Sequence, residues 1–163
     1  MVTNTAGGDL KARSRTTVSH NPGPTVSNQN YAEAYAHDCT GCRTVAAAVQ
    51  VVVVEGSTTS FTPTNAALAI NENCHSCQTF AYANQYVFSP LRPVELSDSA
   101  REQLAEVRDQ IAEVVRSQKP FPQMSADLDS LSSQLISIVR AEIQRAGTSA
   151  DEKPFREVQE QHT

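Results

Sequence analysis

Two stretches of the chain, NYAEAYAHDCTGCRTVAAAVQVVV at residues 30–53 and NAALAINENCHSCQTFAYANQYVF at residues 65–88, align without a gap. The offset is 35 residues throughout, and ten of the 24 aligned pairs are identical. Internal repetition at a fixed period is the sequence signature of repeat architectures. We therefore interpret residues 29–90 as two 35-residue CxxC β repeats.

The identical positions in this alignment alternate with variable ones, as at Thr44, Ala46, Ala48 and Gln50. A period of two residues is typical of a β-strand, whose successive side chains point to opposite faces. Each repeat is therefore predicted to contain two strands joined near its CxxC pair. The favoured fold class is α+β, with two tandem two-stranded β repeats forming one small sheet. A solenoid-like stack of the two copies is the alternative.

The repeated face of these strands carries only small or amide side chains. Alanines allow another backbone layer to approach more closely than the usual sheet spacing of about 10 Å. Asparagine and glutamine at equivalent positions can form amide ladders if the copies stack in register. The candidate residues of this repeat face are Asn30, Thr44, Gln50, Asn65, Thr79 and Gln85.

The segments that flank the repeats have different compositions. Residues 1–28 are rich in Thr, Ser, Asn and Gly and are predicted to be a flexible arm, in which Lys11, Arg13 and Arg15 could form a docking patch. Residues 96–147 carry two apolar stripes of helical period separated by KPFP, which predicts an antiparallel helical hairpin. Residues 148–163 are predicted to be a flexible tail.

Charge and hydropathy limit the classes of partner. The net charge of -5 argues against nucleic-acid binding, which needs a clustered positive face. The longest apolar run, residues 45–54, is too short for a transmembrane helix, so membrane insertion is not expected. The first ten residues lack the apolar core of a signal peptide, and a cytoplasmic location is therefore the alternative to the extracytoplasmic one considered below.

Cysteine chemistry is the strongest chemical signal in the sequence. All the cysteines lie in CxxC pairs: Cys39, Cys42, Cys74 and Cys77. This pattern suits a zinc site with four thiolate ligands, although zinc knuckles usually place a small residue after the second cysteine, where this chain has Arg43 and Gln78. A thiol–disulfide oxidoreductase is a weaker alternative, because neither pair is followed by a helix that would activate a thiol.

We favour a disulfide within each CxxC pair, joining Cys39 to Cys42 and Cys74 to Cys77. Such a bond fixes the turn and thereby the register of both strands. Bonds between the repeats, from Cys39 to Cys74 and from Cys42 to Cys77, remain an alternative. On the disulfide interpretation no cofactor is expected, and on the zinc interpretation the metal is the cofactor.

The pattern N-x-A-x-A-x4-C-x2-C-x-T-x-A-x-A-x-Q, present twice and followed by a helical hairpin, resembles the C-terminal, non-catalytic CxxC-repeat region of actinobacterial peptide zinc metalloprotease proteins. The resemblance covers about residues 28–146. It implies an extracytoplasmic or secreted location. The protease activity does not transfer, because this chain has no HExxH motif.

These observations predict a protein that is not an enzyme. The expected function is an extracytoplasmic structural or protein-interaction module, able to self-assemble, with disulfide-clamped β repeats. Its expected partner is a protein, either a second copy or a cell-surface partner. The alternative is a cytoplasmic module that binds zinc through all four cysteines.

Overall fold

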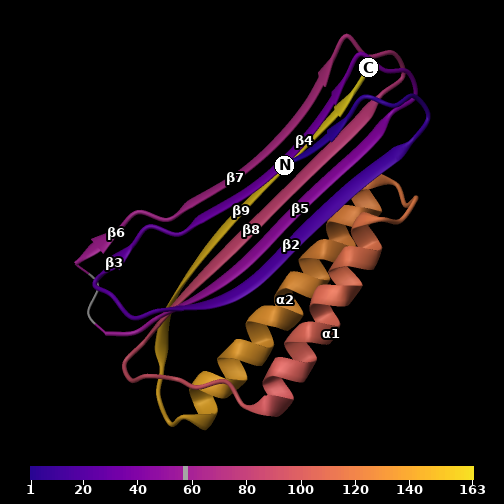
Figure 1. The fold of residues 1–163 in the computed structure, drawn as a ribbon. Helices are drawn as coiled ribbons and strands as arrows, with labels where there is room; N and C mark the ends of the chain where they lie inside the picture. Colours follow the sequence, from indigo (N-terminus) through magenta and orange to yellow (C-terminus); the bar gives the residue numbers. More distant parts are fainter. Residues whose placement is uncertain (57–58) are drawn as a thin grey trace.

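The computed structural model describes residues 1–56 and 59–163 (Figure 1). The described residues form nine strands and two helices: β1 (Val2–Asn4), β2 (Leu10–Asn21), β3 (Thr25–Val26), β4 (Gln29–His37), β5 (Arg43–Val54), β6 (Ser60–Phe61), β7 (Thr64–Glu72), β8 (Gln78–Pro90), α1 (Asp98–Val115), α2 (Phe121–Arg145) and β9 (Ala150–His162).

Equivalent strands of successive repeats lie side by side and pair in parallel. Strand β4 pairs with β7 and β5 pairs with β8, each at an offset of 35 residues. The first 28 residues continue the pattern, since β1 pairs with β4, β2 with β5 and β3 with β6. The chain thus winds through three stacked coils. Coil 1 contains β1, β2 and β3, coil 2 contains β4, β5 and β6, and coil 3 contains β7 and β8.

The prediction of two-stranded repeats forming one small sheet is wrong. The strands belong to three sheets, with the orders β1-β4-β7, β2-β5-β8-β9 and β3-β6. A strand finds its hydrogen-bonding partner in the neighbouring coil and not in its own repeat. Alternation of residues reports only which face a side chain takes, so it could not distinguish these two pairings. The coarse α+β description, with the helices after the repeats, fits loosely.

Both terminal segments form strands instead of the predicted flexible arm and tail. Residues 1–28 contain β1, β2 and β3, and residues 148–163 contain β9, which pairs antiparallel with β8. These segments bury little apolar surface of their own. They are ordered because coils 2 and 3 offer them edges with unpaired backbone N–H and C=O groups.

Alanines fill the space between the two main sheets. Ala32, Ala34 and Ala67 from the β4–β7 side meet Ala46, Ala48, Ala81 and Ala83 from the β5–β8 side, and each of these side chains is buried. Asn65 donates to the carbonyl of Ala83 and Asn71 to that of Cys77, which places Ala67 opposite Ala81. Side-chain amides of one sheet therefore reach the backbone of the other.

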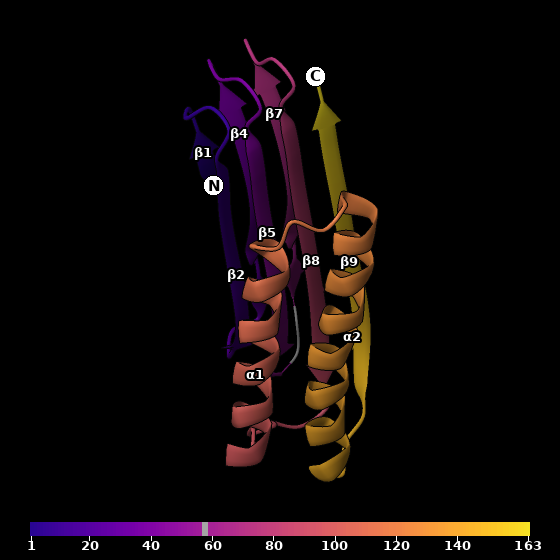
Figure 2. The same ribbon diagram turned by 90° about the vertical axis from the view of Figure 1, so that its right-hand side faces the viewer.

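The helical hairpin covers the other face of the β2-β5-β8 sheet, as Figure 2 shows. Helix α1 begins after Ser97, whose hydroxyl accepts a hydrogen bond from the Ala100 N–H. The larger side chains of β5 and β8, including Val49, Phe80 and Tyr82, pack against both helices and form the main core. Neither α1 nor α2 has the length and apolar composition that a membrane crossing requires.

Candidate functional site

The two CxxC turns lie directly on top of each other at one end of the stack. Each connects the two long strands of its coil, β4 to β5 and β7 to β8. The turns are joined through the backbone, since the Gly41 N–H donates to His75 O at 2.8 Å and the His75 N–H donates to Cys39 O at 3.1 Å. The 35-residue register therefore continues through the turns and brings the cysteines of both repeats together.

Three sulfur atoms, those of Cys39, Cys74 and Cys77, lie within 4.8 Å of one another, and Cys42 Sγ is bonded to that of Cys39. We call the four sulfur atoms the sulfur cluster. Cys39 Sγ lies 3.7 Å from Cys74 Sγ and 3.7 Å from Cys77 Sγ. Cys39, Cys42 and Cys77 are buried, and Cys74 is half-buried. Coil 1 closes the other side, where Ala6 O lies 3.2 Å from Cys42 Sγ.

Cys39 and Cys42 form a disulfide, whereas Cys74 and Cys77 are free thiols. The structure therefore contains one of the two predicted disulfides. Desolvation and the hydrogen bond to Cys77 raise the pKa of the Cys74 thiol. A raised pKa keeps the thiol protonated at neutral pH, which is the opposite of what a redox catalyst needs. The sulfurs of Cys39, Cys74 and Cys77 lie within 4.8 Å of one another and could hold a metal ion.

The repeat-face residues lie away from the sulfur cluster, along the stack. Asn30 donates to Asn65 Oδ1 at 2.8 Å, and Gln85 donates to Gln50 Oε1 at 2.6 Å. Thr44 and Thr79 are buried at equivalent positions of β5 and β8. All six residues are buried or half-buried along the stack. Asn30 and Gln50 also line a hollow of about 430 Å³ near the start of β4.

Strand β9 closes the coil 3 end of the stack. It pairs with β8 over its whole length, from Ala150 to His162. Its glutamines reach across to the other sheet, where Gln159 Oε1 accepts from the Ala69 N–H at 3.2 Å and Gln161 accepts from the Asn71 N–H. The edge of β8 is therefore paired with β9, whereas β7 is the outer strand of its own sheet and is hydrogen-bonded to β9 through the N–H groups of Ala69 and Asn71.

The coil 1 end is open within the described residues. Strand β2 is the outer strand of its sheet, and its 12 residues pair on one side only, with β5. In the other sheet β1 pairs only with residues 34–36 of β4, so residues 29–33 have no strand beside them on that side among the described residues. A hollow of about 430 Å³ lies there, between the start of β4 and the inner face of β2.

Basic side chains border this open edge. Arg13 and Arg15 line the 430 Å³ hollow, and they also line a second hollow of about 450 Å³ beside Arg108 and Arg116 of α1. Both arginines of β2 are exposed, and within residues 1–56 and 59–163 neither forms an ion pair. A positive strip thus follows β2 on a chain whose net charge is negative.

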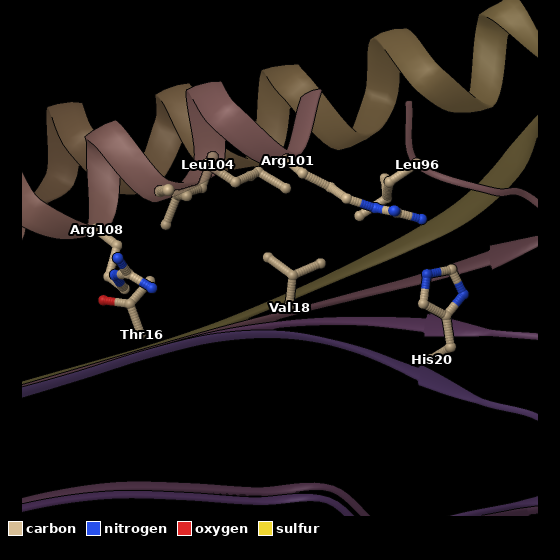
Figure 3. Close-up of a pocket in the computed structure, with 9 residues that line it drawn as sticks. Thr16, Val18, His20, Leu96, Arg101, Leu104 and Arg108 are labelled. Atoms are coloured by element: carbon tan, nitrogen blue, oxygen red, sulfur yellow. The ribbon is translucent and has the colours of Figure 1, made fainter. Parts of the chain in front are cut away.

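Figure 3 shows a third hollow, of about 370 Å³, between the outer face of β2 and α1. Val18 of β2 and Leu104 of α1 point toward each other across it, and Arg101 and Arg108 lie at its margin. The side chains of β2 are therefore incompletely covered on the helix side. The open edge of β2 thus combines three features: unpaired backbone N–H and C=O groups, an apolar hollow on the helix side, and arginine side chains along its border.

The sequence alone indicated the sulfur cluster but not the β2 edge. The sequence predicts that Lys11, Arg13 and Arg15 could form a docking patch within a flexible arm, whereas the structure places them on the ordered strand β2. The signal that could have revealed the strand is the alternation of LKARSRTTV at residues 10–18, where Leu10, Ala12 and Val18 share one face. Coil 1 lacks cysteines and the Ala-x-Ala pattern, so the alignment of repeats did not extend to it.

Comparison of the chain with family models, curated proteins and solved structures finds no match.

Proposed function

We propose that this chain is a non-enzymatic protein-interaction module that binds an extended, acidic segment of a partner protein along β2. The observation that carries the proposal is the contrast between the ends of the stack. Strand β9 covers the coil 3 end, whereas β2 exposes a 12-residue edge at the coil 1 end. Addition of a strand to such an edge is a recurring mode of peptide recognition.

The backbone of β2 supplies the affinity in this proposal. Alternate N–H and C=O groups of an edge strand point away from the sheet and can pair with any extended chain. A twelve-residue partner would extend the β2-β5-β8-β9 sheet by one strand. The hollows of about 430 and 370 Å³ on its two faces leave room for the partner's side chains.

The basic residues supply the selectivity. Arg13 and Arg15 lie two residues apart on one face of β2, so they favour a partner with carboxylates at alternate positions. The same charges oppose pairing of β2 with β2 of a second copy, because like charges on adjacent strands repel. We therefore favour an acidic partner over the self-assembly that the repeats alone suggested.

A location outside the reducing cytosol is part of the proposal. The resemblance to the CxxC-repeat region implies it, and the Cys39–Cys42 disulfide supports it, since disulfides persist mainly in oxidising compartments.

The test is the binding of a fluorescently labelled twelve-residue peptide of alternating glutamate and threonine, followed by anisotropy. We expect saturable binding at low salt, and a peptide of alternating lysine and threonine should not bind. The substitution Arg13→Glu should weaken binding about three- to tenfold, and Arg13→Glu with Arg15→Glu should weaken it further.

The matched control is Arg92→Glu, because Arg92 is exposed in the segment between β8 and α1 and the substitution changes the net charge equally. It should leave the affinity unchanged. The proposal fails if neither peptide binds, if both bind equally, or if Arg92→Glu weakens binding as much as Arg13→Glu. Light scattering on the same samples reports self-association separately.

A further inference from the structure

We propose that reduction of the Cys39–Cys42 disulfide converts the sulfur cluster into a zinc site with four thiolate ligands. The inference concerns the CxxC end of the stack and does not depend on the proposed binding at β2. It rests on the spacing of the sulfur atoms, on their burial and on the rigidity of the turns that carry them.

The spacing matches the requirement of zinc. Four sulfurs at a Zn–S distance of about 2.3 Å around one ion lie about 3.8 Å from one another, by tetrahedral geometry. The distances from Cys39 Sγ to Cys74 Sγ and to Cys77 Sγ are both 3.7 Å. Two edges of the tetrahedron are therefore already present, although no bond holds Cys74 or Cys77 to Cys39.

Cys42 is the fourth ligand in this proposal: its Sγ lies outside the group of three sulfur atoms within 4.8 Å of one another, and it turns toward them once its bond to Cys39 is broken. A phosphine reductant attacks one sulfur of the disulfide, the S–S bond breaks, and the phosphorus is oxidised to the phosphine oxide with oxygen from water. The two hydrogens of that water protonate the two sulfurs. Binding of Zn²⁺ then displaces the protons of all four thiols, because the thiolate is the metal ligand.

The backbone holds the two pairs together without the metal. Hydrogen bonds link the turns at Gly41, His75 and Gln78, the last donating its N–H to Cys42 O at 2.8 Å. Ligands that are already placed cost little ordering entropy on binding. Three of the four cysteines are buried, which protects a thiolate site from competing solvent.

Arg43 and Gln78, which occupy the position after the second cysteine where zinc knuckles usually have a small residue, make contacts away from the sulfur atoms. Arg43 lies over the ring of Phe121, 4.2 Å from its centroid, and donates to Gln78 Oε1 at 2.8 Å. Both residues therefore lie along the sheet toward α2, and neither crowds the sulfur atoms. The metal would join coil 2 to coil 3 at the turns, where the disulfide joins only residues of coil 2.

The experiment compares the full chain before and after reduction with a water-soluble phosphine under argon. After incubation with Zn²⁺ and gel filtration, we expect the reduced protein to retain one zinc ion per chain and the unreduced protein to retain none. Incubation with Co²⁺ should give the absorption bands of a tetrahedral tetrathiolate complex, which a site with a histidine ligand would not reproduce.

The double substitution Cys74→Ser and Cys77→Ser should abolish retention, with circular dichroism as the check on folding. Cys74 is half-buried, so Cys74→Ser alone provides a milder variant that should lose most of the retained zinc. His75→Ala should retain the metal as the wild type does. Equal zinc in the reduced and unreduced protein, or undiminished zinc in the cysteine variants, would overturn the proposal.

Discussion

A leucine in place of Ala67 tests the thin alanine layer between the sheets most sharply. Ala67 is 3% exposed and lies opposite Ala81, with the backbone of β8 directly behind. Leucine adds three carbon atoms to a space that alanines fill from both sides. Overpacking of a tightly packed interior costs about 1–3 kcal/mol. We expect a loss of about 3 kcal/mol, because the stacked turns and β9 prevent the sheets from separating.

The neighbouring substitution Ala66→Leu is the matched control. Ala66 precedes Ala67 on β7 but faces outward, on the same side as Leu68, which is 43% exposed. It should change the free energy of unfolding by no more than about 0.5 kcal/mol. Urea unfolding followed by circular dichroism measures both. Equal effects of the two leucines would refute the assignment of the small-residue face to the interior.

Other substitutions test separate parts of the structure. Asn30→Ala removes donations to Asn65 Oδ1 and to Ala48 O, and should lower the free energy of unfolding in urea by about 1–3 kcal/mol; an unchanged value would contradict a role of Asn30 in joining the coils. The pKa of Glu142 is held near 2 by Arg145 and by the N–H of Ser97, against an ordinary value of 4.5. The stabilisation it provides is therefore complete above about pH 4.5 and is lost as the pH falls toward 2, so Glu142→Gln should lower the melting temperature at pH 7 but not at pH 2; an equal deficit at both would contradict this. Val158→Pro, opposite Tyr82 in β9, should uncover the edge of β8 and increase association in light scattering, and an unchanged monomer would show that β9 does not protect that edge.

The sequence predicted the repeat, the strands on each side of the CxxC pairs and the two helices. The 35-residue offset of Asn30 and Asn65 reappears as a pair of hydrogen-bonded amides. The sequence does not show which strands pair. Pairing within a repeat and pairing between repeats both place the same alternate residues on one face. An alanine face covered by a second backbone layer belonged to the solenoid-like alternative and not to the favoured single sheet, and its position between two stacked sheets depends on long-range pairing.

Coil 1 and β9 were missed for a different reason. Their residues carry few apolar side chains, so local composition resembles that of disordered chain. Their order comes from pairing with strands that are far away in sequence, such as β9 with β8. The cysteine pairing was predicted only in part. The disulfide between Cys39 and Cys42 agrees with the prediction, whereas Cys74 and Cys77 are free thiols, which the CxxC spacing does not predict.

Hydrogen exchange resolved by residue, on the protein alone and with the glutamate–threonine peptide, tests most directly whether the open end is the binding surface. In the free protein, alternate amides of β2 should exchange much faster than those of β5, which is paired on both sides. The peptide should slow exchange within β2 and leave β7 and β9 unchanged. Protection confined to the β9 end or to the helices, with β2 unaffected, would contradict the account.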